Sequence, residues 1–290
     1  MMIKRHKKLK LLVTKIITTT LVGVISIPLF AATKAEVDFD GWGRLISYPG
    51  KKEVACPTQD NKTGVLLVIG QSNSANHADK AMITKYPEKV YNYFNGKCYV
   101  ASSPLLGATG THGEFLTPLA DYLLEMNVYK NIIIISSGMD GTKVARWEKG
   151  GDLNNMLMSV LDELKSKFKI TEVIFHQGES DYLERTPPLQ YQQSFKSLVS
   201  SLRLEGKNTP PFYYSIATRC GYGWYAHNPI ALVQHTLASY EDKIYLGADT
   251  DVSIPASERS FAICHFTEIG QLKAAYAFAL AIAQNKEPNL

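Results

Sequence analysis

Residues 65–76 read Val-Leu-Leu-Val-Ile-Gly-Gln-Ser-Asn-Ser-Ala-Asn, an unbroken apolar run that ends abruptly in a polar turn. Five consecutive apolar residues without polar alternation are typical of a parallel strand covered on both faces. Gly70 allows a sharp turn, and Ser72 then lies at the carboxyl end of the strand, where open α/β sheets bind ligands. Ser72 is either a nucleophile at this turn or simply the cap of the next helix.

The rest of the chain alternates between strand patterns and helix patterns. Strands are expected at 89–94, 97–100, 131–136, 172–175, 212–217 and 243–246, and helices at 114–125, 153–164, 189–204, 228–240 and 268–283. Asn95-Gly96 between the first two of these strands predicts a hairpin. The alternation predicts an α/β domain whose mostly parallel sheet is covered by helices on both faces.

The positive formal charge of +4 belongs to the N-terminus. Six of the 31 Lys and Arg residues lie in the first fifteen positions, so the remainder carries 25 basic and 27 acidic residues, a net charge of −2. This distribution argues against a nucleic-acid partner. The basic start, the apolar stretch 16–30 and the small residues that follow predict a signal peptide over 1–32, with an uncleaved anchor as the alternative.

An N-terminal wrap is expected over 33–63, and the main α/β domain over 64–290. No later segment is apolar for the ~20 residues that would span a bilayer, so we expect no other membrane contact. The predicted location is therefore secreted or periplasmic. The four cysteines lack metal-type spacing, and export favours disulfides. Of the three connectivities that the sequence allows, Cys56–Cys98 and Cys220–Cys264 are expected, because each pair brackets one edge of the supposed active face. Four reduced thiols are the alternative.

Polar residues follow several of the predicted strands, and these strand ends share one edge of a doubly wound sheet. Ser72 follows the first strand, the sequence His-Gln-Gly-Glu-Ser-Asp at 176–181 follows another, and His265 lies near the C-terminal helix. A serine needs a base to become a nucleophile, and histidine titrates in the right range. His265 could instead be an ordinary residue at a helix start.

Three blocks together resemble the SGNH hydrolase superfamily, in its branch of sialate O-acetylesterase-like carbohydrate acetylesterases. They are Gly-Gln-Ser-Asn at 70–73, the block at 176–181, and Cys-His-Phe at 264–266, within a resemblance that covers about 64–283. The resemblance implies a three-layer, flavodoxin-like α/β/α sandwich. It also implies Ser72 as nucleophile, His265 as general base, and an oxyanion hole formed by Ser72, Gly113 and Gln177.

One position departs from the family pattern. The family commonly has an aspartate three residues before the histidine, and this chain has Ala262. A working Ser-His dyad, or a substitute acid from Glu179, Asp251 or Glu258, would preserve activity.

We therefore expect a serine esterase that removes acetyl groups from a glycan or another small acetyl ester, without a cofactor and without a metal. A carbohydrate-binding pseudoenzyme of the same fold and a GDSL-like lipase are the alternatives. Tyr213, Tyr214, Tyr222, Trp224 and Tyr225 are expected either to line a sugar-binding rim or to pack in the core.

Overall fold

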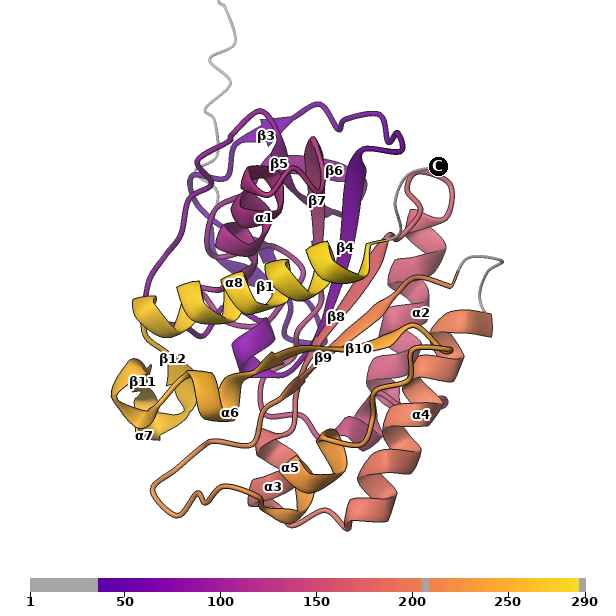
Figure 1. The fold of residues 1–290 in the computed structure, drawn as a ribbon. Coiled ribbons are helices and arrows are strands. Elements are labelled where there is room, and N and C mark those ends of the chain that lie inside the picture. Colours follow the sequence, from indigo (N-terminus) through magenta and orange to yellow (C-terminus); the bar gives the residue numbers. More distant parts are fainter. Residues whose placement is uncertain (1–35, 205–208, 287–290) are drawn as a thin grey trace, which may run out of the picture. The chain divides into compact units, whose positions relative to one another are not determined.

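An eight-stranded sheet forms the centre of the computed structural model, which describes residues 36–204 and 209–286 (Figure 1). Its strand order is β10-β9-β8-β4-β7-β5-β6-β3. The strands are β3 (Glu53–Val54), β4 (Thr63–Gly70), β5 (Val90–Phe94), β6 (Lys97–Val100), β7 (Asn131–Ser136), β8 (Glu172–His176), β9 (Phe212–Ile216) and β10 (Ile244–Asp249). The six strands from β10 to β5 run parallel, and only β6 and β3 run antiparallel to their neighbours. The predicted α/β class and mostly parallel sheet are confirmed.

The apolar run in β4 is continuous because both faces of the sheet are covered. Val65, Leu67 and Ile69 belong to the core beneath α2 (Asp152–Leu164) and α4 (Pro188–Leu204). Leu66 and Val68 belong to the opposite core, beneath α1 (Leu116–Glu125) and α8 (Glu268–Asn285). Successive side chains of a strand point to opposite faces, so each face receives apolar residues only.

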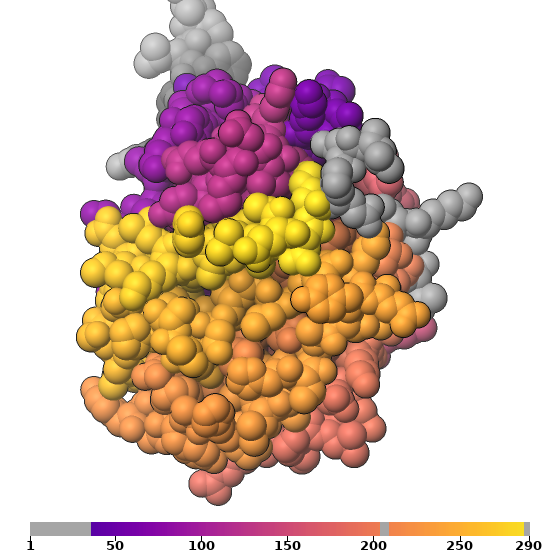
Figure 2. Space-filling model, in the orientation of Figure 1, coloured from indigo at the N-terminus to yellow at the C-terminus, as the bar shows by residue number. Residues whose placement is uncertain are grey.

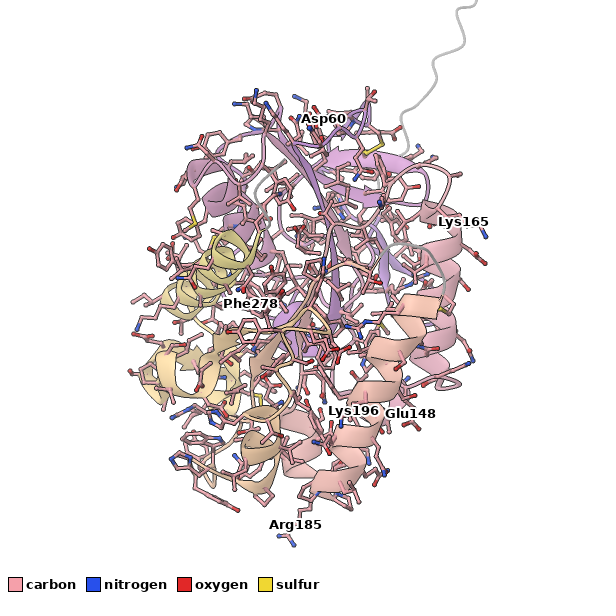
Figure 3. All side chains as sticks on the ribbon, turned by 45° about the vertical axis from the view of Figure 1, so that its right-hand side comes forward. Asp60, Glu148, Lys165, Arg185, Lys196 and Phe278 are labelled. Atoms are coloured by element: carbon pink, nitrogen blue, oxygen red, sulfur yellow. A yellow bond between two sulfur atoms is a disulfide. The ribbon has the colours of Figure 1, made fainter. Side chains whose placement is uncertain are left out.

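The C-terminal helix α8, yellow in Figures 1 and 2, lies across the sheet between the N-terminal segments and β10. Its Phe278 is fully buried and points inward from the helix (Figure 3). A Cβ atom on Gly247 of β10 would lie 2.3 Å from the Phe278 ring. Gly247 therefore lets the helix pack closely against the edge strand of the parallel sheet.

The predicted hairpin is present, with β5 and β6 antiparallel on either side of Asn95 and Gly96. Before it, β1 (Asp38–Phe39) and β2 (Leu45–Ser47) form a separate two-stranded sheet, and β3 pairs with β6. Cys56 and Cys98 form a disulfide, which ties this early segment to β6. The first predicted disulfide is confirmed. The signal peptide or anchor predicted over 1–32 lies outside the described residues.

The helix expected over 228–240 is shorter than predicted, because α5 covers only Pro229–Gln234. The Asn228 side chain caps its start, and Ser239 already pairs with Ile244 beside β10. The remaining short elements are η1 (Ser72–Ser74), η2 (Val144–Arg146), α3 (Glu179–Leu183), α6 (Thr250–Ser253), η3 (Ala256–Glu258), β11 (Arg259–Ser260), α7 (Phe261–Cys264) and β12 (His265–Phe266). Within the described ranges, none of the helices has the length and apolar character that a bilayer span requires.

The strand order reverses at β4. The strands β5 and β7 lie on one side of it in the sheet, and β8, which comes later in the chain, lies on the other side. In open α/β sheets such a switch point creates a crevice outside the carboxyl ends of the strands. Ser72 follows β4 and lies at this point.

Candidate active site

Ser72 is held in a tight turn that only glycine permits at its start. Gly70 has a φ angle of +126°, and a Cβ atom there would lie 2.1 Å from the carbonyl oxygen of His176. Ser72 is then the first residue of η1, whose N-cap is Gln71. Among the described residues its hydroxyl has no hydrogen-bond partner, so Ser72 is not the helix cap.

Asn73 joins this turn to the segment that carries His265. Its Nδ2 donates to the carbonyl of Cys264 at 3.1 Å, and its Oδ1 accepts the N–H of Phe266 at 3.3 Å. Both neighbours of His265 are therefore bonded to the residue that follows Ser72. The disulfide between Cys220 and Cys264, the second one predicted, also anchors this segment. The structure thus brings the two predicted catalytic residues, 193 positions apart, to one place.

The His265 ring is half-buried between two other rings. Phe261 stacks on it with a centroid separation of 5.4 Å, and the His77 ring lies 5.5 Å away. Burial lowers the pKa of His265 below its usual value, and the neighbouring His77 lowers that pKa further. Both effects favour the free base, which is the form of the imidazole that accepts a proton.

The chain before His265 adopts an uncommon backbone conformation. Phe261, Ala262 and Ile263 have φ angles of 39°, 55° and 60°, all in the left-handed region. Gly221 donates a backbone hydrogen bond to Ala262, and the disulfide holds the next residue. The Ala262 side chain is exposed. The position where the family commonly has its aspartate therefore faces solvent in this chain.

The three substitute acids suggested by the sequence are engaged elsewhere. Asp251 accepts hydrogen bonds from the backbone of Thr218 and Arg219. Glu258 pairs with Lys273 at 2.7 Å, and Glu179 accepts from Asn73 at 2.9 Å. Among the described residues, none of the three contacts the His265 ring. Glu179 supports the site indirectly through Asn73, whereas Asp251 and Glu258 are corrected to structural roles.

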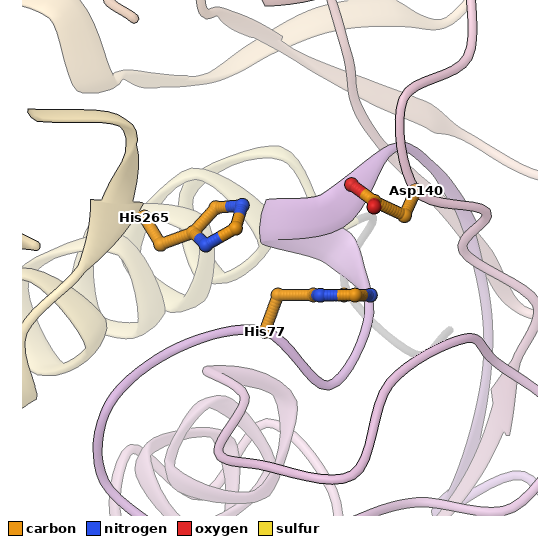
Figure 4. A group of neighbouring side chains, drawn as sticks. All are labelled: His77, Asp140 and His265. Atoms are coloured by element: carbon orange, nitrogen blue, oxygen red, sulfur yellow. The ribbon is translucent and has the colours of Figure 1, made fainter. Parts of the chain in front are cut away.

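Asp140 is a carboxylate that lies near His265 in the described structure. It follows β7, and its carboxylate lies within 4.8 Å of ligand atoms of both His77 and His265 (Figure 4). It also raises the pKa of His265, although by less than burial and His77 lower it. Sequence reasoning missed both His77 and Asp140, because neither stands at a recognisable spacing from His265.

Two of the three proposed oxyanion donors are not free. The Gly113 N–H donates to the carbonyl of Ala78 at 2.8 Å. Only glycine fits at this position, because a Cβ atom on residue 113 would lie 1.9 Å from the carbonyl oxygen of Lys80. Gln177 is fully buried, and its Nε2 donates to Thr142 and Asp181. The roles assigned to Gly113 and Gln177 are corrected to structural ones. The Ser72 N–H has no acceptor within the described chain, as an oxyanion donor requires.

A network of buried polar side chains supports the Ser72 turn and the segment that carries His265. Burial raises the pKa of Glu179 to about 7 and lowers the pKa of His176 to about 3. His176 Nδ1 and Glu179 Oε1 are 3.7 Å apart, and since His176 is neutral, this contact is not an ion pair. Arg259, another residue that the sequence reasoning missed, donates from its guanidinium to the carbonyls of Cys264 and Thr250. These bonds fix the backbone on which His265 stands.

The aromatic residues divide into two groups. Tyr213 and Tyr214 are buried in β9 and belong to the core. Tyr222 and Tyr225 are exposed, and Trp224 stacks under the Arg219 guanidinium at 3.6 Å. A groove of about 620 Å³ is lined by residues that include Tyr182, Tyr225 and Cys220, whose disulfide partner precedes His265. The remaining residues that line this groove are Leu183, Arg185, Thr186, Pro187, Pro188, Gly221, Gly223, Pro229 and Ile230.

This fold defines the class as an α/β/α sandwich, with Ser72 in the turn that follows the first strand of the parallel part of the sheet. The chain belongs to the family described as carbohydrate esterase, sialic acid-specific acetylesterase, whose profile matches residues 62–279. The predicted resemblance is confirmed. A comparison with curated protein sequences finds no match.

Solved structures agree with this assignment at the level of the fold. A protein from Arabidopsis thaliana is similar with a TM-score of 0.58 and 17% identity, covering 77% of this chain and 98% of its own. NanS has a TM-score of 0.54 and 17% identity, with coverage of 77% and 97%. A carbohydrate acetylesterase from Xanthomonas citri has a TM-score of 0.52 and 17% identity, with coverage of 76% of this chain and 55% of that one.

Proposed function

We propose that this chain is an exported serine esterase that removes O-acetyl groups from a carbohydrate, with Ser72 as nucleophile and His265 as general base. Family membership supports the reaction class. The observation that carries the residue roles is the pair of hydrogen bonds from Asn73 to Cys264 and Phe266, which hold His265 beside the serine turn. The two disulfides support export to an oxidising compartment.

The reaction follows from the two side chains. Ser72 Oγ attacks the ester carbonyl carbon while His265 takes the hydroxyl proton, and the Ser72 N–H donates to the oxyanion. The Gly110 N–H is a second candidate donor, because it has no acceptor among the described residues and the Gly110 backbone approaches His77. Collapse breaks the bond to the sugar oxygen, which receives the proton from His265. Water, activated by the same histidine, then releases acetate and restores Ser72.

Hydrolysis of an aryl acetate by the purified protein tests the proposal. Ser72→Ala should abolish turnover above the uncatalysed rate, and His265→Ala should reduce it by several orders of magnitude. Ser253→Ala is the matched control, because this exposed serine donates only to the carbonyl of Asp249. Equal rates in the wild type and Ser72→Ala would refute the proposal. If turnover depends on Ser72, acetate release from O-acetylated sialic acid is compared with release from acetylated xylan to identify the sugar.

Asn73→Ala examines the positioning step. It removes the bonds to both neighbours of His265 and leaves both catalytic side chains in place. We expect kcat to fall by about 10- to 100-fold, since a shift of about 1 Å in a catalytic group is enough for such a loss. An unchanged kcat would mean that the disulfide and Arg259 position the histidine without Asn73.

A pseudoenzyme of the same fold is the second candidate, because no carboxylate hydrogen-bonds the His265 ring among the described residues and Ala262 is exposed. It predicts glycan binding without turnover, measured by calorimetry with an acetylated glycan. Ser72-dependent turnover excludes it.

A further inference from the structure

We propose that His77, Asp140 and His265 bind a divalent transition-metal ion, with Zn²⁺ the best match, and that this ion inhibits the esterase. The three residues come from distant parts of the chain: the loop after η1, the loop after β7, and β12. Figure 4 shows His265 and Asp140 facing one another with His77 beside both. Each offers a ligand atom, and these atoms lie within 4.8 Å of one another.

The donor set selects the class of metal. Two imidazoles and one carboxylate suit Zn²⁺ and other late first-row ions, whereas Mg²⁺ and Ca²⁺ prefer oxygen donors alone. Metal–ligand bonds of about 2.0 to 2.2 Å place neighbouring tetrahedral ligands about 3.3 Å apart. A spread of 4.8 Å therefore requires a closure of up to about 1.5 Å, to which rotation of the exposed Asp140 side chain can contribute. A water molecule would complete four-coordination.

The backbones that carry the ligands are already fixed. Thr109 Oγ1 lies 3.1 Å from His77 Nε2 and also accepts the Asp140 N–H at 2.9 Å, so one hydroxyl group ties two ligands together. Residues beside metal ligands commonly orient them in this way. A Cβ atom on Gly110 would lie 2.7 Å from His77 Nε2, so glycine at 110 keeps this space open.

The site overlaps the proposed catalytic base, and inhibition follows from this overlap. The His265 imidazole cannot ligate a metal and accept the Ser72 proton through the same lone pair. The inhibitory part rests on the proposed function, whereas metal binding itself does not. The two can therefore be measured separately.

Calorimetric titration of ZnCl₂ into chelator-stripped, untagged protein tests binding. We expect one ion per chain, and at least a tenfold weaker Kd in both His77→Ala and Asp140→Asn. His235→Ala, which removes an exposed histidine remote from the site, is the matched control and should bind zinc as the wild type does. No binding below ~1 mM, or equal affinity in all four proteins, would overturn the site.

Aryl acetate hydrolysis with and without zinc tests inhibition, with each protein compared with its own metal-free rate. The wild type should lose activity over the range of its measured Kd and recover with chelator, whereas His77→Ala should need at least tenfold more zinc. Zinc that binds without lowering turnover, or that raises it, would overturn the inhibitory role. If stripped wild type shows no turnover, the proposed function fails while the titration still decides the metal site.

Discussion

Glu179 is the residue for which the structure gives the most quantitative prediction. Its side chain is fully buried, and Oε1 accepts the hydrogen bond from Asn73, whereas Oε2 has no partner among the described residues. Burial raises the pKa of this carboxyl to about 7, against the smaller opposing effects of Asn73 and Arg259. The perturbation is Glu179→Gln, which keeps the shape and an oxygen acceptor for Asn73 but cannot ionise.

The sign and size of the effect follow from proton linkage. Below pH 4.5, the usual value for this carboxyl, it is protonated in both the folded and the unfolded chain, and its burial carries no ionisation penalty. As the pH rises, the unfolded chain ionises first, so the folded protein binds more protons and its stability falls. Above about pH 7 both states are ionised and the loss is complete. The difference between 4.5 and about 7 corresponds to about 3 kcal/mol.

Urea unfolding of the wild type and Glu179→Gln between pH 4.5 and 8.5 measures this contribution. The free energy of unfolding of the variant minus that of the wild type should rise by about 3 kcal/mol as the pH increases across this range. Other buried carboxyls titrate in both proteins and cancel in the difference. Glu241→Gln, at an exposed position, is the control and should run parallel to the wild type. Parallel curves for Glu179→Gln as well would refute the reasoning, because the carboxyl would then ionise as in water.

Two further predictions concern the segment around His265. The two disulfides close loops of similar length, with separations of 42 and 44 residues, so replacing either pair by serine should lower the free energy of unfolding by about 4 kcal/mol. Turnover of aryl acetate by the folded protein should fall when Cys220–Cys264 is removed, because Cys264 precedes His265, but not when Cys56–Cys98 is removed. An equal fall in both variants would contradict a positioning role for Cys220–Cys264. Ala262→Asp should not raise kcat, because this position is exposed; a rise of about tenfold or more would show that the added carboxylate reaches His265.

The fold was predictable because its signals are local. An apolar run such as Val65–Ile69 must be covered on both faces, and the Asn95-Gly96 pair favours a hairpin in almost any context. The cysteine pairing was expected because each pair brackets one edge of the supposed active face, and both disulfides are present. Helix ends were less accurate, as at α5, because Ser239 already pairs beside the next strand.

The site was predictable only where residues belong to motifs. Ser72 and His265 stand in recognisable blocks, but the direction of an N–H group is not a property of residue type. Gly113 is required by the close approach of Lys80, which the sequence cannot reveal. Asp140 and His77 converge on His265 only through the order of the strands. Tertiary contacts between distant loops are therefore what sequence reasoning lacked here.

The exposed Ala262 separates two tasks that an aspartate behind the histidine performs together. The first is orientation, and here the hydrogen bonds of the Asn73 side chain, the disulfide at Cys264 and stacking by Phe261 hold the imidazole in place. The second is stabilisation of the positive charge that His265 would acquire in the transition state of the proposed reaction. Asp140 acts on that charge through space and without a hydrogen bond, so its contribution is weaker than that of a direct contact. The geometry therefore fits the proposed Ser-His dyad, assisted by a carboxylate that does not hydrogen-bond the ring, and the same Asp140 is a ligand of the proposed metal site.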